Sequence, residues 1–324
     1  MSTLETLRSG GKRSLARALA SVEAAPDAPQ TQALLDAAWR APRGHALGLT
    51  GPPGVGKSTL IDALIRAMRA QGQTVGVIAV DPSSRVSRGA LLGDRTRLSI
   101  DPEDQGVFVR SMAARDRLGG LAELTFPALV LMRAVHDLVI VETVGVGQSE
   151  TDVLDIADTV VFCAQPGSGD ALQFMKAGIM EIPHVVVVTK GDMGAVADRA
   201  VADLRGALSL AAPGAAEVPV LRVAAAKGEG IEALVAAVRT RAEDLARAGT
   251  LDTVRRRQTR TWMARSLAEA FGREGLARVR ADLDTDSALE APFKRVAEAK
   301  ARLSRALSVG FAPQVADSLA GKAG

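Results

Sequence analysis

The sequence is poor in the residues that build disulfide frameworks and metal centres. Its 324 residues include one cysteine, Cys163, and three histidines, His45, His136 and His184. A single cysteine excludes a disulfide framework within the chain and fits a reducing compartment. The histidines are scattered in apolar or strand contexts, whereas a protein that carries a transition metal needs soft or imidazole ligands in clusters. We therefore expect the histidines to be packed structural residues.

Long uncharged apolar runs are also missing. None reaches the roughly 18 residues that suggest a membrane-spanning helix. The first residues, MSTLETLRSGGKRSLARAL, contain no apolar core of signal-peptide length. These absences predict a cytoplasmic protein that does not bind a membrane.

An excess of either charge is absent as well. Forty Lys and Arg stand against 37 Asp and Glu, which gives a formal net charge of +3. This balance argues against nucleic acid as the partner. The cluster Arg255, Arg256 and Arg257 lies in an amphipathic helical pattern, where such clusters are usually solvated or face a partner. A nucleic-acid-binding module would rest on this cluster, and salt-dependent DNA binding would reveal it.

The hydrophobic pattern divides the chain into three parts. Residues 1–44 have helical spacing that Pro26 and Pro29 split into two helices, and residues 249–324 form a helical tail. Residues 45–248 alternate short apolar runs with longer amphipathic ones. The runs interpreted as buried strands are ALGLT, VGVIAV, LVIVE, TVVFCA, HVVVVT and VPVLRVA. Together they predict an α/β fold, with a mostly parallel central sheet that helices cover on both faces.

The helical tail carries an apolar stripe of Trp262, Met263 and Leu267. Such a stripe suits a docking or dimer surface. It suits equally well a helix that covers the sheet domain, and the sequence leaves both interpretations open.

A glycine-rich loop is the strongest functional signal. Residues 51–58, GPPGVGKS, satisfy the pattern G-x-x-x-x-G-K-[ST] directly after one predicted strand and before an amphipathic helix. Backbone N–H groups of such a loop curl around a β-phosphate, and the helix N-terminus adds positive potential. Lys57 is expected to reach the β- and γ-phosphates, and Ser58 to offer its hydroxyl to Mg²⁺. The predicted phosphate-site residues are Gly51, Pro52, Pro53, Gly54, Val55, Gly56, Lys57, Ser58 and Thr59.

Two carboxylates end predicted strands at the edge where parallel sheets bind ligands. Glu142 ends LVIVE, where a Walker B acid belongs, and Asp81 ends VGVIAV. We expect Glu142 to orient the Mg²⁺ through water and Asp81 to join the same metal shell with Ser58. Gly145 is placed to give a backbone N–H to the γ-phosphate. Asp81 also fits a simpler interpretation, in which it caps the following turn.

A second motif predicts which base is bound. The strand HVVVVT ends in residues 189–192, TKGD, which is the place and pattern of the guanine signature N-K-x-D with Thr189 for Asn. Asp192 would accept from guanine N1–H and the exocyclic amine, a donor pair that adenine lacks, and Lys190 would lie along the base face. The later turn, with Ala225, Ala226 and Lys227, would bring the Ala225 N–H to the guanine oxygen. The missing Asn would remove one side-chain amide that ties the loops together.

Taken in order, the segments GLTGPPGVGKSTLIDAL, AVDPSS, LLGDRTR, IVETVGVGQSE, PGSGDALQFMKAGIMEI and TKGD resemble the MeaB family, also called ArgK or MMAA. The resemblance extends into RRRQTRTWM and back to GGKRSLARALASVE. It implies a P-loop NTPase of the SIMIBI type that hydrolyses GTP to GDP with Mg²⁺. It also implies a homodimer and a metallochaperone role, in which the protein gates adenosylcobalamin loading from an adenosyltransferase and protects or rescues an acyl-CoA mutase. Cobalamin would be contacted only through that partner.

The resemblance also implies three switch regions. They are residues 81–97 with Asp94, residues 143–150, and residues 166–178. The departures from the family pattern are Thr189, the Asp116-Arg117 pair and the segment RVSRG. These departures bear on the choice of mutase, methylmalonyl-CoA mutase or a relative such as 2-hydroxyisobutyryl-CoA mutase, more than on nucleotide binding.

The residues that follow Gly145 also bear on the rate of GTP hydrolysis. Many GTPases place a glutamine that orients water directly after the second-switch glycine, but Val146 follows Gly145 here and Gln148 lies three residues past the glycine. A slow intrinsic rate is expected. A P-loop small-molecule kinase or ATPase is the alternative; it would need an acceptor pocket and an arginine-rich lid, and adenine would not need Asp192.

Overall fold

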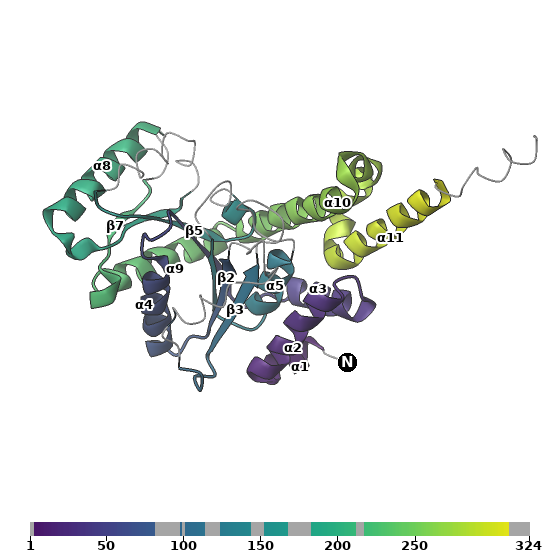
Figure 1. Ribbon diagram of the computed structural model, residues 1–324, viewed down its shortest axis with the longest axis horizontal. Coiled ribbons are helices and arrows are strands. Elements are labelled where there is room, and N and C mark those ends of the chain that lie inside the picture. The colour runs from purple at the N-terminus through teal and green to yellow at the C-terminus, as the bar shows by residue number, and fades with distance from the viewer. Residues whose placement is uncertain are drawn as a thin grey trace, which may run out of the picture.

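The described residues contain a seven-stranded sheet in the order β3-β2-β4-β1-β5-β6-β7, in which each pair of neighbours is parallel. Figure 1 shows helices on both sides of this sheet. The protein is described by a computed structural model that covers residues 3–81, 98, 101–113, 124–143, 152–167, 183–211 and 217–310. The strands are β1 (His45–Thr50), β2 (Val75–Asp81), β3 (Val107–Ala113), β4 (Leu138–Glu142), β5 (Thr159–Ala164), β6 (Val185–Val188) and β7 (Val220–Arg222). The predicted α/β class with a parallel sheet is confirmed.

The strand β3 is the one that the sequence pattern did not predict. Its residues VFVRSMA interrupt the apolar run with Arg110 and Ser111. Arg110 donates to Glu23 of the N-terminal helices. An edge strand has one neighbour only, so it tolerates polar side chains that a central strand of this sheet would have to bury.

Alternate residues of the strands face opposite layers of helices. In β2, Val75 and Val77 pack with α4 (Lys57–Ala70) and α9 (Ile231–Arg247), whereas Ile78 and Val80 pack with α5 (Thr125–Arg133) on the other face. On the α5 face, α8 (Ala195–Ala211) covers the strands near β7. The helix α4 begins at the phosphate loop, so burial of its apolar side fixes the direction in which that loop leaves the sheet.

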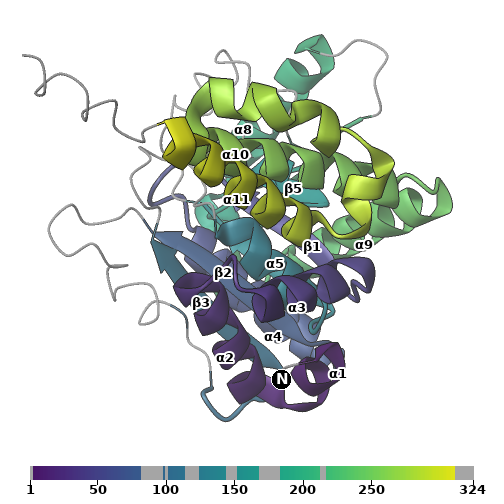
Figure 2. The same ribbon diagram turned by 90° about the vertical axis from the view of Figure 1, so that its right-hand side faces the viewer.

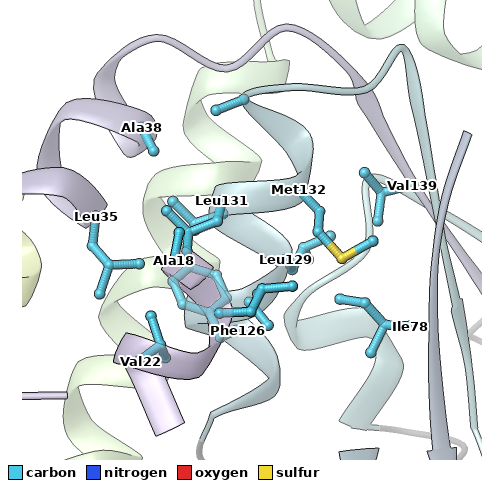
Figure 3. Packing of buried hydrophobic residues seen from close by; sticks show 14 of the residues in the cluster. Ala18, Val22, Leu35, Ala38, Ile78, Phe126, Leu129, Leu131, Met132 and Val139 are labelled. Atoms are coloured by element: carbon cyan, nitrogen blue, oxygen red, sulfur yellow. The ribbon is translucent and has the colours of Figure 1, made fainter. Parts of the chain in front are cut away.

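Helices from both chain ends form a further layer over α5. They are α1 (Leu4–Ser9), α2 (Gly11–Ala24), α3 (Pro29–Arg40), α10 (Leu251–Leu283) and α11 (Pro292–Gly310). Short 3-10 turns occur elsewhere in the chain at η1 (Val153–Asp155), η3 (Gly191–Met193) and η4 (Ala225–Lys227), and between α10 and α11 at η5 (Asp286–Glu290). Figure 3 shows Val22 and Leu35 on one side of α5, and Ile78 and Val139 of the sheet on the other. The prediction of two N-terminal helices was wrong. A third exists because Gly11 has a left-handed φ of 59°, which interrupts the helical backbone between α1 and α2.

Direct contacts join the two chain ends. The Asp36 carboxylate in α3 accepts from the N–H groups of Phe293 and Lys294, and so caps the first turn of α11. Trp39 Nε1 donates to the Thr259 hydroxyl of α10 at 2.9 Å. Figure 2 shows α10 and α11 side by side, with α3 and α5 beneath them.

The apolar stripe of the helical tail is covered within the chain. Met263 and Leu267 are 1% and 0% exposed and pack against α11. The Trp262 ring packs against Phe126 of α5 and Phe293 of α11, with centroid distances of 5.4 and 4.5 Å, and these two rings also contact each other at 6.3 Å. The surface that the sequence suggested for a dimer is thus occupied inside one chain.

A buried ion cluster attaches α10 to the sheet domain. Asp158, at the start of β5, accepts from Arg255 through both oxygens, at 2.9 and 2.7 Å, and from the Ala46 N–H. Arg133 lies 3.7 Å from the same carboxylate and is 2% exposed. Burial alone would raise the pKa of Asp158, but the hydrogen bonds from Arg255 and the two positive charges lower it to about 2. Arg255 is therefore an internal anchor, and of the predicted basic cluster only part is left on the surface.

The three histidines bond to neighbouring protein groups. His45 shares a hydrogen bond with the Thr159 hydroxyl, His136 contacts the Met132 carbonyl, and His184 Nδ1 accepts from the Val160 N–H. Burial lowers the pKa of each imidazole, to about 4 for His184. Across the described ranges, no helix combines the length and apolar character that crossing a bilayer requires.

Candidate nucleotide-binding site

The loop between β1 and α4 packs directly against β5. Gly51 has a φ of 142°, and a Cβ at this position would lie 2.3 Å from the Cys163 carbonyl oxygen. Only glycine fits such an approach. Gly56 adopts a left-handed φ of 104°, and α4 begins at the next residue. The strand, loop and helix that the phosphate motif requires follow one another directly, so the first N–H groups of α4 lie beside the loop.

Lys57 lies across this loop. Its Nζ donates to the carbonyl oxygens of Gly51 at 2.7 Å and Pro52 at 3.2 Å, and the side chain is buried. Pro53 and Gly54 are exposed at the outer bend. The loop's own carbonyls thus hold a buried positive charge where phosphate oxygens are expected.

Ser58 and Glu142 meet at the carboxyl edge of the sheet. The Ser58 hydroxyl donates to Glu142 Oε1 at 3.3 Å. In register, Glu142 lies opposite Leu49 of β1 and Ala79 of β2, two residues before Asp81, which ends β2. A hydroxyl and a carboxylate are the hard oxygen ligands that Mg²⁺ prefers, with phosphate oxygens and water completing its shell. These residues fit the predicted Mg²⁺ site.

Thr189 links the predicted base-binding residues to the loop between β1 and α4. Its hydroxyl lies 2.7 Å from the Val55 carbonyl oxygen and 3.0 Å from that of Ala164, and the side chain is 3% exposed. The sequence interpretation held that replacing Asn would remove a link between the loops. In the structure, the hydroxyl of Thr189 itself makes this link, to the Val55 carbonyl. The sequence did indicate that such a link was possible, because Thr189 directly follows β6, the strand beside β5, and a threonine hydroxyl can donate a hydrogen bond.

The residues predicted to bind the base lie together at the ends of β6 and β7. Lys190 Nζ donates to Gln165 Oε1 at 2.7 Å, and Lys227 Nζ lies 3.5 Å from Asp192 Oδ2. The Gly191 N–H donates to the Val223 carbonyl, which fastens this loop to the end of β7. Ala225 begins η4 on the adjacent turn, followed by Ala226 and Lys227. Sequence reasoning missed Gln165 because nothing but its place after β5 marks it.

Several predicted residues lie outside the described ranges. They are Asp94, Gly145 and Gln148, and with them most of the three predicted switch regions. Thr143, the described residue of the second region, is 1% exposed. Its N–H donates to the Leu49 carbonyl at 3.1 Å, and its hydroxyl bonds to that of Thr50. The chain therefore leaves β4 fastened to β1, beside the phosphate loop.

Cys163 lies against Gly51 of the phosphate loop as a fully buried thiol. Burial raises the pKa of this thiol to about 12, and the Lys57 charge offsets only part of the effect. A neutral buried thiol is a poor nucleophile and a poor metal ligand.

The fold and this site define a P-loop nucleotide hydrolase, and comparison with known proteins makes it a GTPase. The family model described as methylmalonyl Co-A mutase-associated GTPase MeaB matches residues 15–277. The chain belongs to this family, as the sequence resemblance predicted.

Individual relatives agree. A putative GTPase of Pyrococcus abyssi is 41% identical over 79% of this chain and 80% of its own length. The mitochondrial methylmalonic aciduria type A homolog of Mus musculus is 40% identical over 67% of this chain and 54% of its own. Among solved structures, one named LAO/AO transport system kinase superposes with a TM-score of 0.64 at 27% identity, over 94% of this chain and 96% of that one.

Proposed function

We propose that this GTPase gates the loading of adenosylcobalamin into an adenosylcobalamin-dependent acyl-CoA mutase and protects or reactivates that mutase. The client would be methylmalonyl-CoA mutase or a relative such as 2-hydroxyisobutyryl-CoA mutase, and an adenosyltransferase is a further candidate partner. One observation carries the proposal: the family match from residue 15 to residue 277 includes helices that precede and follow the sheet domain in the sequence, as well as the phosphate loop. The names of that family and of the mouse relative support it.

The site residues have separate tasks in this proposal. Lys57 holds the β- and γ-phosphates, and Ser58 and Glu142 hold Mg²⁺, which neutralises charge that develops on the phosphate oxygens. Asp192 selects guanine. Val146, after Gly145, cannot orient the attacking water, so hydrolysis is slow until a partner rearranges the second switch around Gln148.

Cobalamin stays with the partner protein. Cys163 is a buried neutral thiol, and the three histidines bond to protein groups. The described residues contain no cluster of three His, Cys, Asp or Glu side chains that could hold a metal. In the proposal, the chain acts on the cofactor through contact with the mutase. Thermodynamic linkage then requires the bound nucleotide to change mutase affinity as much as the mutase changes nucleotide affinity.

Hydrolysis assays with and without the candidate mutase test the proposal. The basal GTP rate should be slow, and the mutase should raise it on the order of 10- to 1,000-fold by ordering residues 81–97, 143–150 and 166–178. The Lys57→Ala variant with the same mutase is the control for contaminating hydrolases. A fast basal rate, or no response to any cobalamin-dependent mutase of the host, refutes the proposal.

Nucleotide preference and the fate of the phosphate test the alternative function, and a separate measurement tests the dimer. A small-molecule kinase would prefer ATP and transfer its phosphate to an acceptor other than water; the solved structure named LAO/AO transport system kinase carries the word kinase in its name. GTP preference with release of inorganic phosphate excludes it. Light scattering of the full chain tests the homodimer, which must use a surface other than the covered stripe at Trp262.

A further inference from the structure

Gln165 has no role in the function proposed above, yet it holds one of the base-binding residues. It follows Ala164, the last residue of β5. Its side-chain oxygen accepts from Lys190 Nζ at 2.7 Å. The contact joins two loops at the carboxyl edge of the sheet, one after β5 and one after β6.

The backbone at Lys190 is held in place by contacts of its two neighbours, independently of the contact with Gln165. Its φ of 51° and ψ of 39° are left-handed, and it is the one non-glycine residue with positive φ in the described part of the chain. On one side, Thr189 is bonded to the phosphate loop. On the other, Gly191 donates to Val223 and accepts from Arg222. A side chain other than glycine retained in this conformation points to a function for that side chain.

The position of the Lys190 ammonium matters because Asp192 is only two residues away. Asp192 already has one lysine near it, Lys227, at 3.5 Å, which is longer than a usual charged hydrogen bond. A second ammonium on Asp192 would compete with the donors of a guanine base. Gln165 is a neutral acceptor, so it holds Lys190 without adding a charge that would act on Asp192.

We infer that Gln165 is a positioning residue for guanine recognition. By holding the Lys190 ammonium, it extends the methylene stem beside the base and keeps Asp192 available to guanine N1–H and the exocyclic amine. The inference rests on the guanine site of the proposed function, but it does not depend on the mutase partner.

Affinities of the full chain for GDP, GTP and inorganic triphosphate test the inference. Gln165→Ala should weaken GDP and GTP about three- to tenfold, the range for one hydrogen bond, and leave triphosphate binding unchanged because the phosphate loop keeps its own contacts. Gln165→Glu retains an acceptor for the ammonium and should bind better than Gln165→Ala. The matched control is Gln71→Ala, because Gln71 also accepts from a cationic side chain, Arg239, but at the far end of α4.

Each result decides a separate question. Unchanged GDP affinity in Gln165→Ala, or an equal loss of triphosphate binding, overturns the positioning role. The Asp192→Asn variant is measured in parallel, and GTP binding equal to the parent in that variant places the base elsewhere and refutes the guanine site itself. If Asp192→Asn loses GTP while Gln165→Ala does not, only the present inference fails.

Discussion

Thr189 Oγ1 lies 2.7 Å from the carbonyl oxygen of Val55, so one hydroxyl connects the end of β6, where the base is predicted to bind, with the predicted phosphate loop. The same hydroxyl lies 3.0 Å from the Ala164 carbonyl. It has one proton for two acceptors, whereas the amide of an Asn has two. The two halves of the site are therefore coupled through a single shared donor.

Thr189→Val keeps the shape of the side chain and removes this donor. We expect GDP affinity to fall about three- to tenfold, the effect of one lost hydrogen bond, with inorganic triphosphate weakened as well because the loop itself is released. Thr189→Ser should restore binding. Isothermal titration of the three proteins measures the effect, and equal affinities for Thr189→Val and the parent would show that the link is dispensable.

Lys57→Ala should abolish tight binding of triphosphates, with kcat/KM for GTP lowered on the order of 100-fold or more, because it removes the charge that faces the β- and γ-oxygens. It also removes the contacts to the Gly51 and Pro52 carbonyls. A melting temperature without nucleotide shows whether the fold persists. Hydrolysis at the parental rate by a folded variant would exclude this loop as the site.

Asp192→Asn should weaken GTP by at least about tenfold and favour xanthosine triphosphate. The amide of Asn can donate to the 2-oxo group of xanthine, whereas the carboxylate of Asp can only accept. Competition between the two nucleotides for the variant measures the preference. Asp198→Asn is a suitable control, because Asp198 is an exposed carboxylate near the same loop that pairs with Arg222.

Arg255→Met should lower the free energy of unfolding by about 3–5 kcal/mol, because it leaves the Asp158 carboxylate buried without its main partner. The neighbouring Arg256→Met is the matched control: its partner Asp252 is exposed, so about 0.5 kcal/mol or less is expected. Arg133→Met should cost less than Arg255→Met, because Arg133 Nε and Nη1 have no hydrogen-bond partner in the structure. Denaturant titrations of the three variants rank these effects, and equal costs for Arg255→Met and Arg256→Met would contradict the anchor.

The same cluster predicts that the folded chain loses stability in acid. The pKa of Asp158 is lower in the folded chain, about 2, than its ordinary value of 3.8. Its contribution, about 2 kcal/mol by linkage, is therefore complete above pH 3.8 and lost as the pH falls towards 2. The free energy of unfolding of the parent and of Asp158→Asn, measured at pH 7 and near pH 2.5, tests this. The parent should lose more stability than the variant between these two pH values, since the variant lacks the titrating group.

Sequence patterns identified what depends on local spacing. The predicted strands formed because apolar residues in a central strand have no alternative to burial, and the phosphate loop lies where its motif places it. Relationships between distant segments were beyond such reasoning. Arg255 looked like part of a solvated cluster, but it pairs with the buried carboxylate of Asp158, 97 positions away in sequence. Gln165 and Lys190 meet only because β5 and β6 are neighbours in the sheet.

The hydrogen bonds from Phe293 and Lys294 to Asp36 have a consequence for shortened forms of the chain. A helix that begins near residue 292 depends on a carboxylate encoded some 250 positions earlier. Removing the first 40 residues would therefore uncap α11 and uncover the aromatic face of Phe126, Trp262 and Phe293. Loss of the helices that precede β1 would thus damage a helix that follows the sheet domain, so the two helical segments must be kept or lost together.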